Sequence, residues 1–469
     1  MAANAVATDI AVDGADLRKL SASFKGELVG PGHPTYDEDR RVWNGSIDRF
    51  PALIARCSGV ADVMAAIRFA RSTGLPVAVR GGGHSLPGLS VCDGGIVVDL
   101  APMKGIEVDP VARTAKVRAG ALWGELDRET QAVGLATTGG IVSHTGVAGL
   151  TLGGGIGWLH RKHGLTIDQL VSARLITAEG ELVRASEAEN PDLFWGLRGG
   201  GGNFGIVTEF EFRLHPVGPI VLAGPIFWPA EKAPALLRFY REWCAGTPDE
   251  LMTIVIQRKA PALPSVTREL HGQPVVAVSC CYAGAVEEGE AVVRPLKAFD
   301  SPVLDLCQPK PYTAHQGMLD ASFPHGWWYY LRACDVGALT DGVIDVMVEY
   351  GSRIVSPTTS VSLFQMGGAV ARVDDSETAF NGRAAGFTFN INGNSRTAEG
   401  FEAEREWTRA YWSALAPYQT SVYVNFLMDE GPERIRRAYG AQKYERLKAL
   451  KRTYDPTNFF RLNQNIPPD

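Results

Sequence analysis

The chain has 469 residues, of which 45% are hydrophobic and 21% are charged, and its formal net charge is −6. This length exceeds one ordinary core, so two domains are expected, and the lack of a basic excess argues against nucleic acid or anionic membranes as partners. No window approaches the ~18 apolar residues of a membrane span, and the first residues lack a secretory leader pattern. The seven cysteines have no CxxC spacing, which favours a reducing compartment. We therefore expect a cytoplasmic monomer or homodimer.

The first half of the chain alternates short strands with a few helices. Residues 1–45 form a polar entry segment with one helix near 16–24. Ser58 is expected to cap a helix that ends at Gly74. The other elements expected here are a helix at 122–134 and strands at 52–57, 75–79, 95–100, 105–108, 114–119, 171–177, 181–185 and 206–214. Because helices separate only some of these strands, the pattern predicts an α+β fold and not a doubly wound parallel sheet.

After Pro216 the composition changes, because glycine becomes rarer and the alternating strands become longer. This is typical of a second domain with an antiparallel sheet. The expected elements are strands at 275–282 and 327–333, helices at 232–245 and 340–350, and one basic amphipathic helix over 432–451. The predicted organisation is an N-terminal segment at 1–45 packed on the first domain, a first domain at 46–217, a second domain at 218–430, and a C-terminal segment at 431–469 that returns to the first domain.

The most informative segment is 80–86, where three glycines follow a buried apolar strand and precede His84. Without Cβ atoms this backbone can approach a large ligand closely, and its N–H groups can bind a phosphate whose charge Arg80 balances. His84 would then lie against the ligand, although a plain turn with an incidental histidine is the alternative. Further glycine-rich stretches at 146–157 and 200–205 favour one large cofactor lying across all three.

The stretch 200–205 also matches the G-x-G-x-x-G pattern of dinucleotide-binding folds, but that pattern needs a helix after it. Residues 206–212 alternate like a strand instead, so this interpretation fails. No residues have the spacing of metal ligands, and no metal is expected. His144 and His163 flank the glycine-rich stretches and are interpreted as structural.

These stretches belong to a longer series of motifs. In chain order the series is 80–85, 153–157, 161–165 with Asp168, 190–195, 198–207, 367–372, 423–426, 454–458 and 463–465. On this series the chain resembles the berberine-bridge-enzyme-like flavoprotein oxidases, within the vanillyl-alcohol oxidase and para-cresol methylhydroxylase type of FAD-binding family. The resemblance implies a two-subdomain FAD-binding domain and a substrate domain whose antiparallel sheet is covered by helices.

The resemblance also implies how FAD is held. The family's R-G-G-H histidine bonds to the flavin 8α-methyl carbon, and here it is His84. Many members add a cysteine tether at the position of Val142, but no cysteine lies between Cys92 and Cys244, so a single linkage through His84 is expected. The implied FAD-binding residues are Arg80, Gly81, Gly82, Gly83, His84, Ser85, Val142, Ser143, Thr145, Gly146, Gly149, Gly153, Gly154, Gly157, Asn203, Gly205, Ile206, Val207, Tyr423, Asn463 and Asn465.

Three catalytic residues follow from the same resemblance. Tyr423 matches the tyrosine that takes a proton from a substrate hydroxyl, which a phenol does well only when its surroundings lower its pKa. Asn425 would share a strand face with Tyr423. Thr145 occupies the position over the flavin that governs oxygen access, where valine is associated with oxidases and leucine with dehydrogenases. The substrate-pocket candidates are Trp158, Tyr330, Gln365, Asn390 and Asn392.

Together these residues predict an FAD-dependent oxidase. Hydride would leave a small-molecule alcohol, sugar-like or amine substrate, a secondary metabolite included, and oxygen would be reduced to hydrogen peroxide. A flavin-dependent oxygenase of a natural-product pathway is the alternative within the enzyme class. A non-catalytic flavin-binding protein is the alternative outside it. In the aromatic run 327–330, two of four side chains are expected to face away from the cavity, because strand residues alternate between faces.

Overall fold

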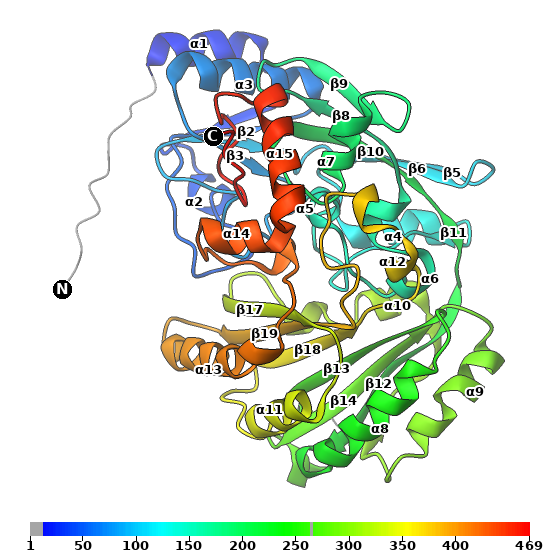
Figure 1. Ribbon diagram of the computed structural model, residues 1–469. Helices are drawn as coiled ribbons and strands as arrows, with labels where there is room; N and C mark the ends of the chain where they lie inside the picture. Colours follow the sequence, from blue (N-terminus) through cyan, green and yellow to red (C-terminus); the bar gives the residue numbers. More distant parts are fainter. Residues whose placement is uncertain (1–12, 263–265) are drawn as a thin grey trace.

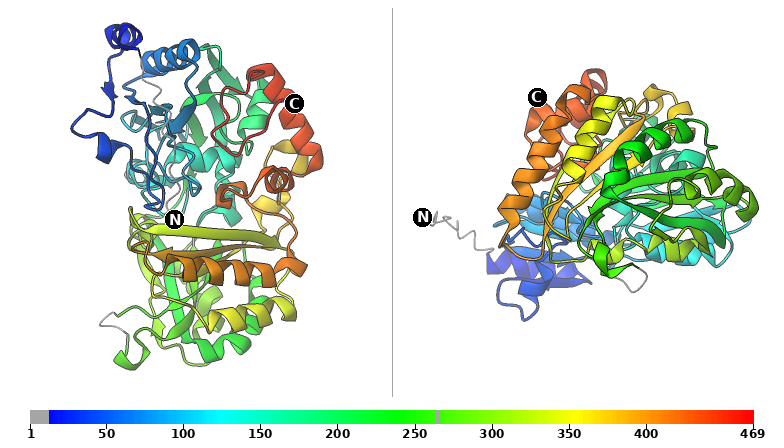
Figure 2. Two further views of the ribbon diagram at one scale, coloured as in Figure 1. Left: turned by 90° about the vertical axis from the view of Figure 1, so that its left-hand side faces the viewer. Right: turned by 90° about the horizontal axis from the view of Figure 1, so that it is seen from below.

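The structure is a computed structural model that describes residues 13–262 and 266–469. It has two lobes (Figure 1): the first lobe comprises residues 13–217 and 422–469, and the second lobe the described residues of 218–421. Figure 2 shows the second lobe packed against one side of the first. No helix among the described residues is long and apolar enough to cross a membrane.

A small sheet opens the first lobe. Its strand order is β1-β2-β4-β3, in which β2, β4 and β3 run parallel and β1 is antiparallel to β2. Buried aliphatic side chains fill both its faces, as parallel strands require. The elements are α1 (Gly14–Ser23), β1 (Glu27–Val29), α2 (Tyr36–Asp39), β2 (Leu53–Arg56), α3 (Val60–Thr73), β3 (Val77–Arg80) and β4 (Ile96–Asp99).

A second, wholly antiparallel sheet completes the first lobe, in the order β5-β6-β10-β8-β9. Its elements and their neighbours are β5 (Ile106–Asp109), β6 (Thr114–Arg118), α4 (Trp123–Gln131), β7 (Leu135–Ala136), α5 (Val147–Gly153), α6 (His160–His163), β8 (Leu170–Ile176), β9 (Leu182–Ser186), α7 (Pro191–Leu197), β10 (Ile206–Arg213) and β11 (His215–Pro216). The strand β10 follows the glycine-rich stretch directly, which confirms that no dinucleotide-type helix begins there.

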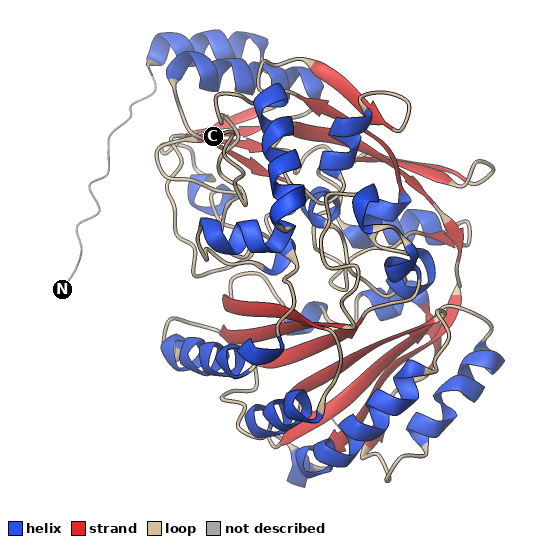
Figure 3. Cartoon of the chain, in the orientation of Figure 1, coloured by secondary structure: helices blue, strands red, loops and turns tan. Residues whose placement is uncertain are grey.

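The second lobe is one large antiparallel sheet, in the order β15-β12-β14-β13-β18-β19-β17, with β16 also paired to β12. Figure 3 shows α8, α9, α11 and α13 on the face that is turned away from the first lobe, so the opposite face is free to meet it. The elements are β12 (Ile220–Pro229), α8 (Ala233–Ala245), β13 (Leu251–Lys259), β14 (Pro274–Tyr282), α9 (Val286–Lys297), β15 (Leu304–Asp305), β16 (Gln308–Pro311), α10 (Tyr312–Gln316), β17 (Trp328–Val336), α11 (Asp341–Gly351), β18 (Ser360–Gln365), α12 (Ala369–Arg372), β19 (Phe387–Ser395) and α13 (Phe401–Ala414). The predicted α+β class and helix-covered antiparallel sheet are confirmed.

Several local predictions need correction. Ser58 does not cap α3: Gly59 is the N-cap, and the Ser58 hydroxyl donates to Asp62 inside the helix over 2.6 Å. The expected tail helix over 432–451 is two helices, α14 (Pro432–Tyr439) and α15 (Ala441–Tyr454), because Gly440 between them has φ 73°, which no helix allows.

The segment on either side of the expected boundary at residue 431 contacts both lobes. Val422, Val424 and Leu427 share a core cluster with residues of α14 and α15, and with Tyr329, Leu331 and Ala333 of β17. Tyr423 packs in a second cluster that also contains residues of both lobes.

A buried ion pair anchors the C-terminal tail. The Nζ atom of Lys451 lies 2.7 Å from a carboxylate oxygen of Asp455, and neither side chain is exposed. Lys451 also donates to the backbone oxygens of Asn203 (2.8 Å) and Phe460 (2.9 Å), so all three of its N–H groups are used. The pair therefore joins α15 to the glycine-rich stretch and to the chain terminus.

We expect Asp455→Asn to lower the free energy of unfolding by about 3–5 kcal/mol, because it leaves the Lys451 ammonium buried without a counter-charge. Denaturant unfolding followed by circular dichroism measures the loss. Asp469→Asn is the matched control: Asp469 is 92% exposed and pairs with Arg452 at 3.4 Å, an interaction worth about 0–1 kcal/mol. Equal stability losses in the two variants would contradict the assigned anchor.

Candidate active site

A cavity of about 380 Å³ lies between the glycine-rich loops of the first lobe and the sheet of the second lobe. Its lining is largely apolar and, among the described residues, contains no charged side chain. The predicted residues that line it are Gly81, Gly82, Gly83, His84, Ser85, Val142, Thr145, Gly146, Gly149, Gly153, Gly205, Ile206, Val207, Asn390, Asn392, Tyr423, Asn425 and Asn463. The fold thus brings together segments that are more than 300 residues apart in the chain.

The first two glycine-rich loops touch each other at the cavity wall. A Cβ atom on Gly82 would lie 2.4 Å from the backbone nitrogen of Gly146, so neither position admits a side chain without moving a backbone. The bare backbone of both loops faces the cavity, and this forms the cradle that a large flat cofactor requires.

Arg80 does not serve as the expected phosphate partner. Its guanidinium bonds the Asp99 carboxylate at 2.8 Å and the backbone oxygen of Asp39, and it does not line the cavity. Arg80 and Asp99 stand opposite each other on the parallel strands β3 and β4. The arginine therefore neutralises a buried carboxylate, and binding of a phosphate in this cavity would depend on backbone N–H groups.

The end of the cavity near the C-terminal tail has unpartnered polar atoms. The Tyr439 hydroxyl and the side-chain oxygens of Asn463 and Asn465 are buried without a hydrogen-bond partner in the described part of the chain. Because buried polar groups are normally paired, the Tyr439 and Asn463 atoms, which line the cavity, fit a polar cofactor such as FAD. Asn203 has a structural role, since its side chain bonds the backbone of Gly200 and Ile466. Asn465 does not line the cavity.

Three predicted cofactor residues are directed elsewhere. The Ser143 hydroxyl and backbone N–H both donate to the carboxylate of Asp320 in the second lobe, the N–H over 2.8 Å. Gly154 packs between Phe380 and Tyr423, and Gly157 packs on the backbone of Gly139. These three residues shape and brace the glycine-rich loops and are not part of the lining.

His84 lines the cavity and is fixed by its neighbours. Its ring stacks on Trp43 at a centroid distance of 4.8 Å, and its Nε2 atom lies 2.7 Å from Nδ1 of His144. Burial, with His144 and His325 nearby, holds the pKa of His84 well below its usual value. His84 is therefore a neutral imidazole at physiological pH, with a lone pair available.

Thr145 and Val142 lie on the loop that precedes α5. Both line the cavity, and the backbone oxygen of Thr145 accepts the N–H of Trp123 at the start of α4 over 3.0 Å. This bond fixes the backbone at Thr145, so its side chain has a defined place at the cavity wall. Val142 presents an inert aliphatic group where a cysteine would offer a thiol.

Tyr423 lines the cavity and accepts two hydrogen bonds. The backbone N–H of Gly155 donates to its hydroxyl oxygen over 2.8 Å, and the Asn425 amide donates over 2.7 Å. Residues Val424–Phe426 form a 3-10 turn and not the expected strand, and the turn brings the two side chains together. Burial raises the pKa of Tyr423 to about 12, against the lowering effect of both donors, so the expected lowering of its pKa is not found.

The sheet of the second lobe forms the opposite wall. Asn390 and Asn392 on β19 and Ser362 and Phe364 on β18 line the cavity, as alternate residues on one face of the sheet. Gln365 is on the other face, where its amide accepts from Thr253 at 2.7 Å and donates to the backbone of Cys244. Its assignment to the pocket was wrong, because it is one residue out of register with that face.

The aromatic run divides between the two faces as expected, but Tyr330 is on the outer one. Its hydroxyl accepts from Arg332 and Arg409, and this directs it toward α13. Tyr329 faces the first lobe instead and stacks on Trp43 at 3.7 Å. Leu331 is the residue of β17 that lines the cavity.

Trp158 is also outside the site. It is 1% exposed, does not line the cavity, and packs on His315 with ring centroids 4.2 Å apart. His163 stacks on His215 at 3.9 Å, which agrees with its interpretation as structural. The lining residues that sequence reasoning missed include Trp43 and Tyr439, because each lies far along the chain from the glycine-rich motifs and has no local signal.

Comparison with known proteins agrees with this geometry. A family model described as "FAD binding domain" matches residues 51–186, and one described as "Berberine and berberine like" matches residues 422–467. The second match begins where the tail returns to the first lobe. Both segments contribute to the wall of the cavity.

Whole-chain relatives cover nearly all of the sequence. An FAD-linked oxidoreductase of Dictyostelium discoideum is 32% identical over 457 residues, which span 96% of this chain and 97% of the relative. An (R)-6-hydroxynicotine oxidase of Paenarthrobacter nicotinovorans is 31% identical, over 95% of this chain and 98% of its own. The crystal structure of 6-hydroxy-D-nicotine oxidase from Arthrobacter nicotinovorans superposes with a TM-score of 0.86 at 30% identity, covering 95% of this chain and 99% of that one.

Proposed function

This chain belongs to the berberine-like family of FAD-linked oxidoreductases, and we propose that it is an oxidase that takes a hydride from a neutral alcohol, sugar-like molecule or amine. When bound, FAD supplies the hydride acceptor, and oxygen is the proposed final acceptor, reduced to hydrogen peroxide. His84 is the proposed sole covalent tether of FAD, since Val142 has no thiol. The wall of bare glycine backbone and the unpartnered Tyr439 hydroxyl and Asn463 amide oxygen support the cofactor part of the proposal.

One observation carries the proposed chemistry. The described lining has three ionisable side chains, His84, Tyr423 and Tyr439, and of these only Tyr423 lies between the glycine-rich loops and the second-lobe sheet. His84 is assigned to the tether, and the Tyr439 hydroxyl lies near Gly201, where the tail closes the cavity. Tyr423 is thus the proposed proton acceptor for a substrate hydroxyl.

Two hydrogen-bond donors around Tyr423 favour this role, against the burial that raises its pKa. Because the two lone pairs of its oxygen accept from Gly155 and Asn425, its own O–H is directed toward the cavity. The same two donors stabilise the phenolate when the proton has left. Asn390 and Asn392, on the facing strand, offer amide groups that can orient the hydroxyl for transfer to Tyr423.

The substrate is proposed to be uncharged. On the second-lobe side of the cavity the described lining contains no arginine, lysine, aspartate or glutamate, and the backbone of β18 and β19 is paired within the sheet, so burying an unpaired charge there would be costly. Phosphorylated or carboxylated molecules are therefore poor candidates. The amides and the Ser362 hydroxyl instead fit a polar molecule with neutral hydrogen-bonding groups.

The test is anaerobic bleaching of the bound flavin by matched pairs of compounds, in which each neutral alcohol, sugar or amine is compared with its phosphate or carboxylate analogue. We expect bleaching by neutral members only, followed by peroxide stoichiometric with substrate when oxygen is admitted. Labelled oxygen in the product would instead support the oxygenase alternative, for which the Thr145 hydroxyl at the cavity wall is the feature in favour. A flavin that no organic compound reduces would support a non-catalytic protein.

A further inference from the structure

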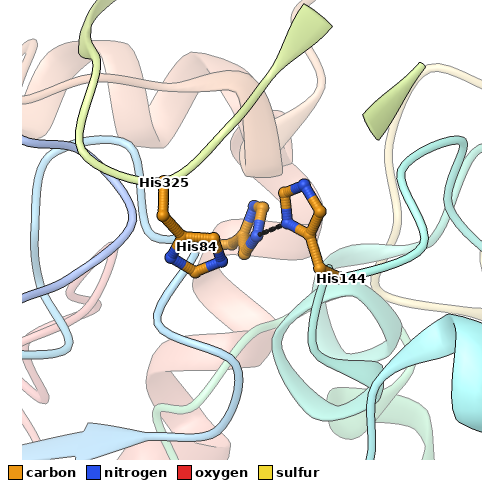
Figure 4. Close-up of side chains that lie close together, drawn as sticks. All are labelled: His84, His144 and His325. Atoms are coloured by element: carbon orange, nitrogen blue, oxygen red, sulfur yellow. Dashed lines mark hydrogen bonds between the residues drawn. The ribbon is translucent and has the colours of Figure 1, made fainter. Parts of the chain in front are cut away.

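Three histidines from separate segments meet at the edge of the cavity (Figure 4). His84 follows β3, His144 precedes α5, and His325 comes from the connection before β17, and their ligand atoms all lie within 4.8 Å of one another. No metal-ligand spacing is recognisable in the sequence, because the three positions are far apart in the chain. Their meeting requires a physical explanation that the proposed tether alone does not give.

The geometry favours a hydrogen bond over a metal centre. Two ligands of one tetrahedral zinc ion lie about 3.3 Å apart, given zinc–nitrogen bonds of roughly 2.0–2.1 Å. The Nε2 atom of His84 and Nδ1 of His144 are closer, at 2.7 Å, which is a hydrogen-bond distance. His325 forms no such bond within the described residues and meets His84 edge to face, with ring centroids 5.5 Å apart.

Both bonded rings are held in place. Trp43 stacks on His84 and is itself stacked on Tyr329 at 3.7 Å, so the His84 ring lies on a layered aromatic support. His144 follows Ser143, whose backbone N–H is bound by Asp320 at 2.8 Å. The pair is therefore preorganised by residues of both lobes, and not formed by chance between mobile side chains.

We propose that His144 orients His84 for attachment of FAD and takes the proton that His84 must lose when the bond forms. This inference rests on the proposed tether at His84. With Nε2–H donated to His144, the lone pair of His84 is on Nδ1, and no described residue forms a hydrogen bond with Nδ1. Nδ1 is then the nitrogen that bonds to the methyl carbon of the isoalloxazine.

Attachment of FAD to His84 is an oxidation, and its atoms and electrons balance when oxygen is the oxidant. One N–C bond forms, and one C–H bond of the methyl group and the Nε2–H bond of His84 break. The two electrons released go to the isoalloxazine and from there to oxygen, which with two protons becomes hydrogen peroxide. His144 receives the proton from Nε2, so no cationic alkylated imidazole remains buried in the apolar site.

The charges around His144 favour this direction of transfer. Burial lowers the pKa of His144, but Asp320 acts against this and raises it. The pKa of His84 has no such support, since burial and both neighbouring histidines all lower it. His144 is therefore the better proton acceptor of the pair.

The experiment measures covalent attachment directly. Full-length apoprotein from riboflavin-limited cells is mixed with FAD, and the covalent fraction is followed by in-gel fluorescence and intact mass. We expect His144→Ala to slow attachment by about tenfold or more, with non-covalent FAD still bound, and added imidazole to restore part of the rate. A role in packing alone would not be rescued by a diffusible base.

Two further variants complete the test. His144→Gln fills the space and can accept from Nε2–H but cannot take a proton, so it is expected to be slow and not rescued. If His144→Ala fails to bind FAD, the rate of FAD attachment in His144→Gln tests the proposal instead. His325→Gln is the matched control and is expected to attach FAD at the wild-type rate. Wild-type rates in His144→Gln, or loss of wild-type attachment on metal chelation, would overturn the inference. Wild-type protein without covalent FAD would instead overturn the proposed tether itself.

Discussion

Tyr423→Phe is expected to lower kcat/KM for an alcohol substrate by about 10²–10⁴-fold, the usual contribution of a positioned general base. Phenylalanine keeps the ring packed against Phe380 and Phe426 but removes the oxygen to which Gly155 and Asn425 donate. Stopped-flow measurement of anaerobic flavin reduction isolates the hydride-transfer step. FAD content should be unchanged, because the glycine-rich loops and the tail remain intact.

A matched control comes from Tyr330, which is on the outer face of the second-lobe sheet. Tyr330→Phe removes a hydroxyl that bonds only Arg332 and Arg409 among the described residues, so kcat/KM should remain near the wild-type value. If both tyrosine variants lose activity equally, the effect arises from a loss of protein stability and the assignment of Tyr423 fails.

The direction in which the rate of flavin reduction changes with pH tests the assignment of Tyr423 as the proton acceptor. Burial raises the pKa of Tyr423 to about 12, and a base with a raised pKa becomes deprotonated only as the pH increases toward that value. The rate of flavin reduction by an alcohol should therefore rise with pH through the neutral and mildly alkaline range. The rise should be absent in Tyr423→Phe, and a flat wild-type profile would contradict proton transfer to this phenol.

His84→Ala should abolish covalent attachment, so that acid precipitation releases all of the FAD, whereas wild-type protein keeps yellow flavin on the chain. The reason is that Val142 offers no second nucleophile, and no cysteine lies among the residues that line the cavity. The measurement is the absorbance of supernatant and pellet after precipitation. His163→Gln is the control, because its ring stacks on His215 away from the cavity.

Release of all FAD from wild-type protein would show that the tether is absent. Retention of FAD by His84→Ala would show that another residue forms the bond. Either result would leave the fold and the FAD-binding cradle unaffected, since these depend on backbone geometry and not on the bond.

Local pattern allowed the glycine-rich loops, β10 and the antiparallel sheet of the second lobe to be predicted, whereas the helix cover of that sheet was implied by the family resemblance. Gly82 and Gly146 could be predicted at the cofactor wall because the lack of a Cβ atom is a property of the residue itself. Asn390 and Asn392 could be predicted on one face because strand residues alternate. The same alternation showed that two residues of 327–330 face outward, but not which two.

Partners that meet across the fold could not be predicted in this way. Arg80 was expected to face a phosphate, yet parallel pairing of β3 and β4 places Asp99 opposite it. Trp158 and Gln365 have the right chemistry for a pocket but are directed into packed interiors by neighbours far along the chain. Nothing local shows that the segment around Tyr423 contacts both lobes, or which core buries Val422 and Val424.

The sequence by itself therefore determined which residues can approach a cofactor. The reason is that the missing Cβ atom of glycine, the imidazole of histidine and the alternation of strand residues are properties of single residues or of a few neighbouring positions. Only the tertiary structure decided which polar groups remain free to act, because an ion pair or hydrogen bond forms with whatever the fold brings near. The bond between His84 and His144 shows this most directly: sixty residues separate two rings that lie 2.7 Å apart.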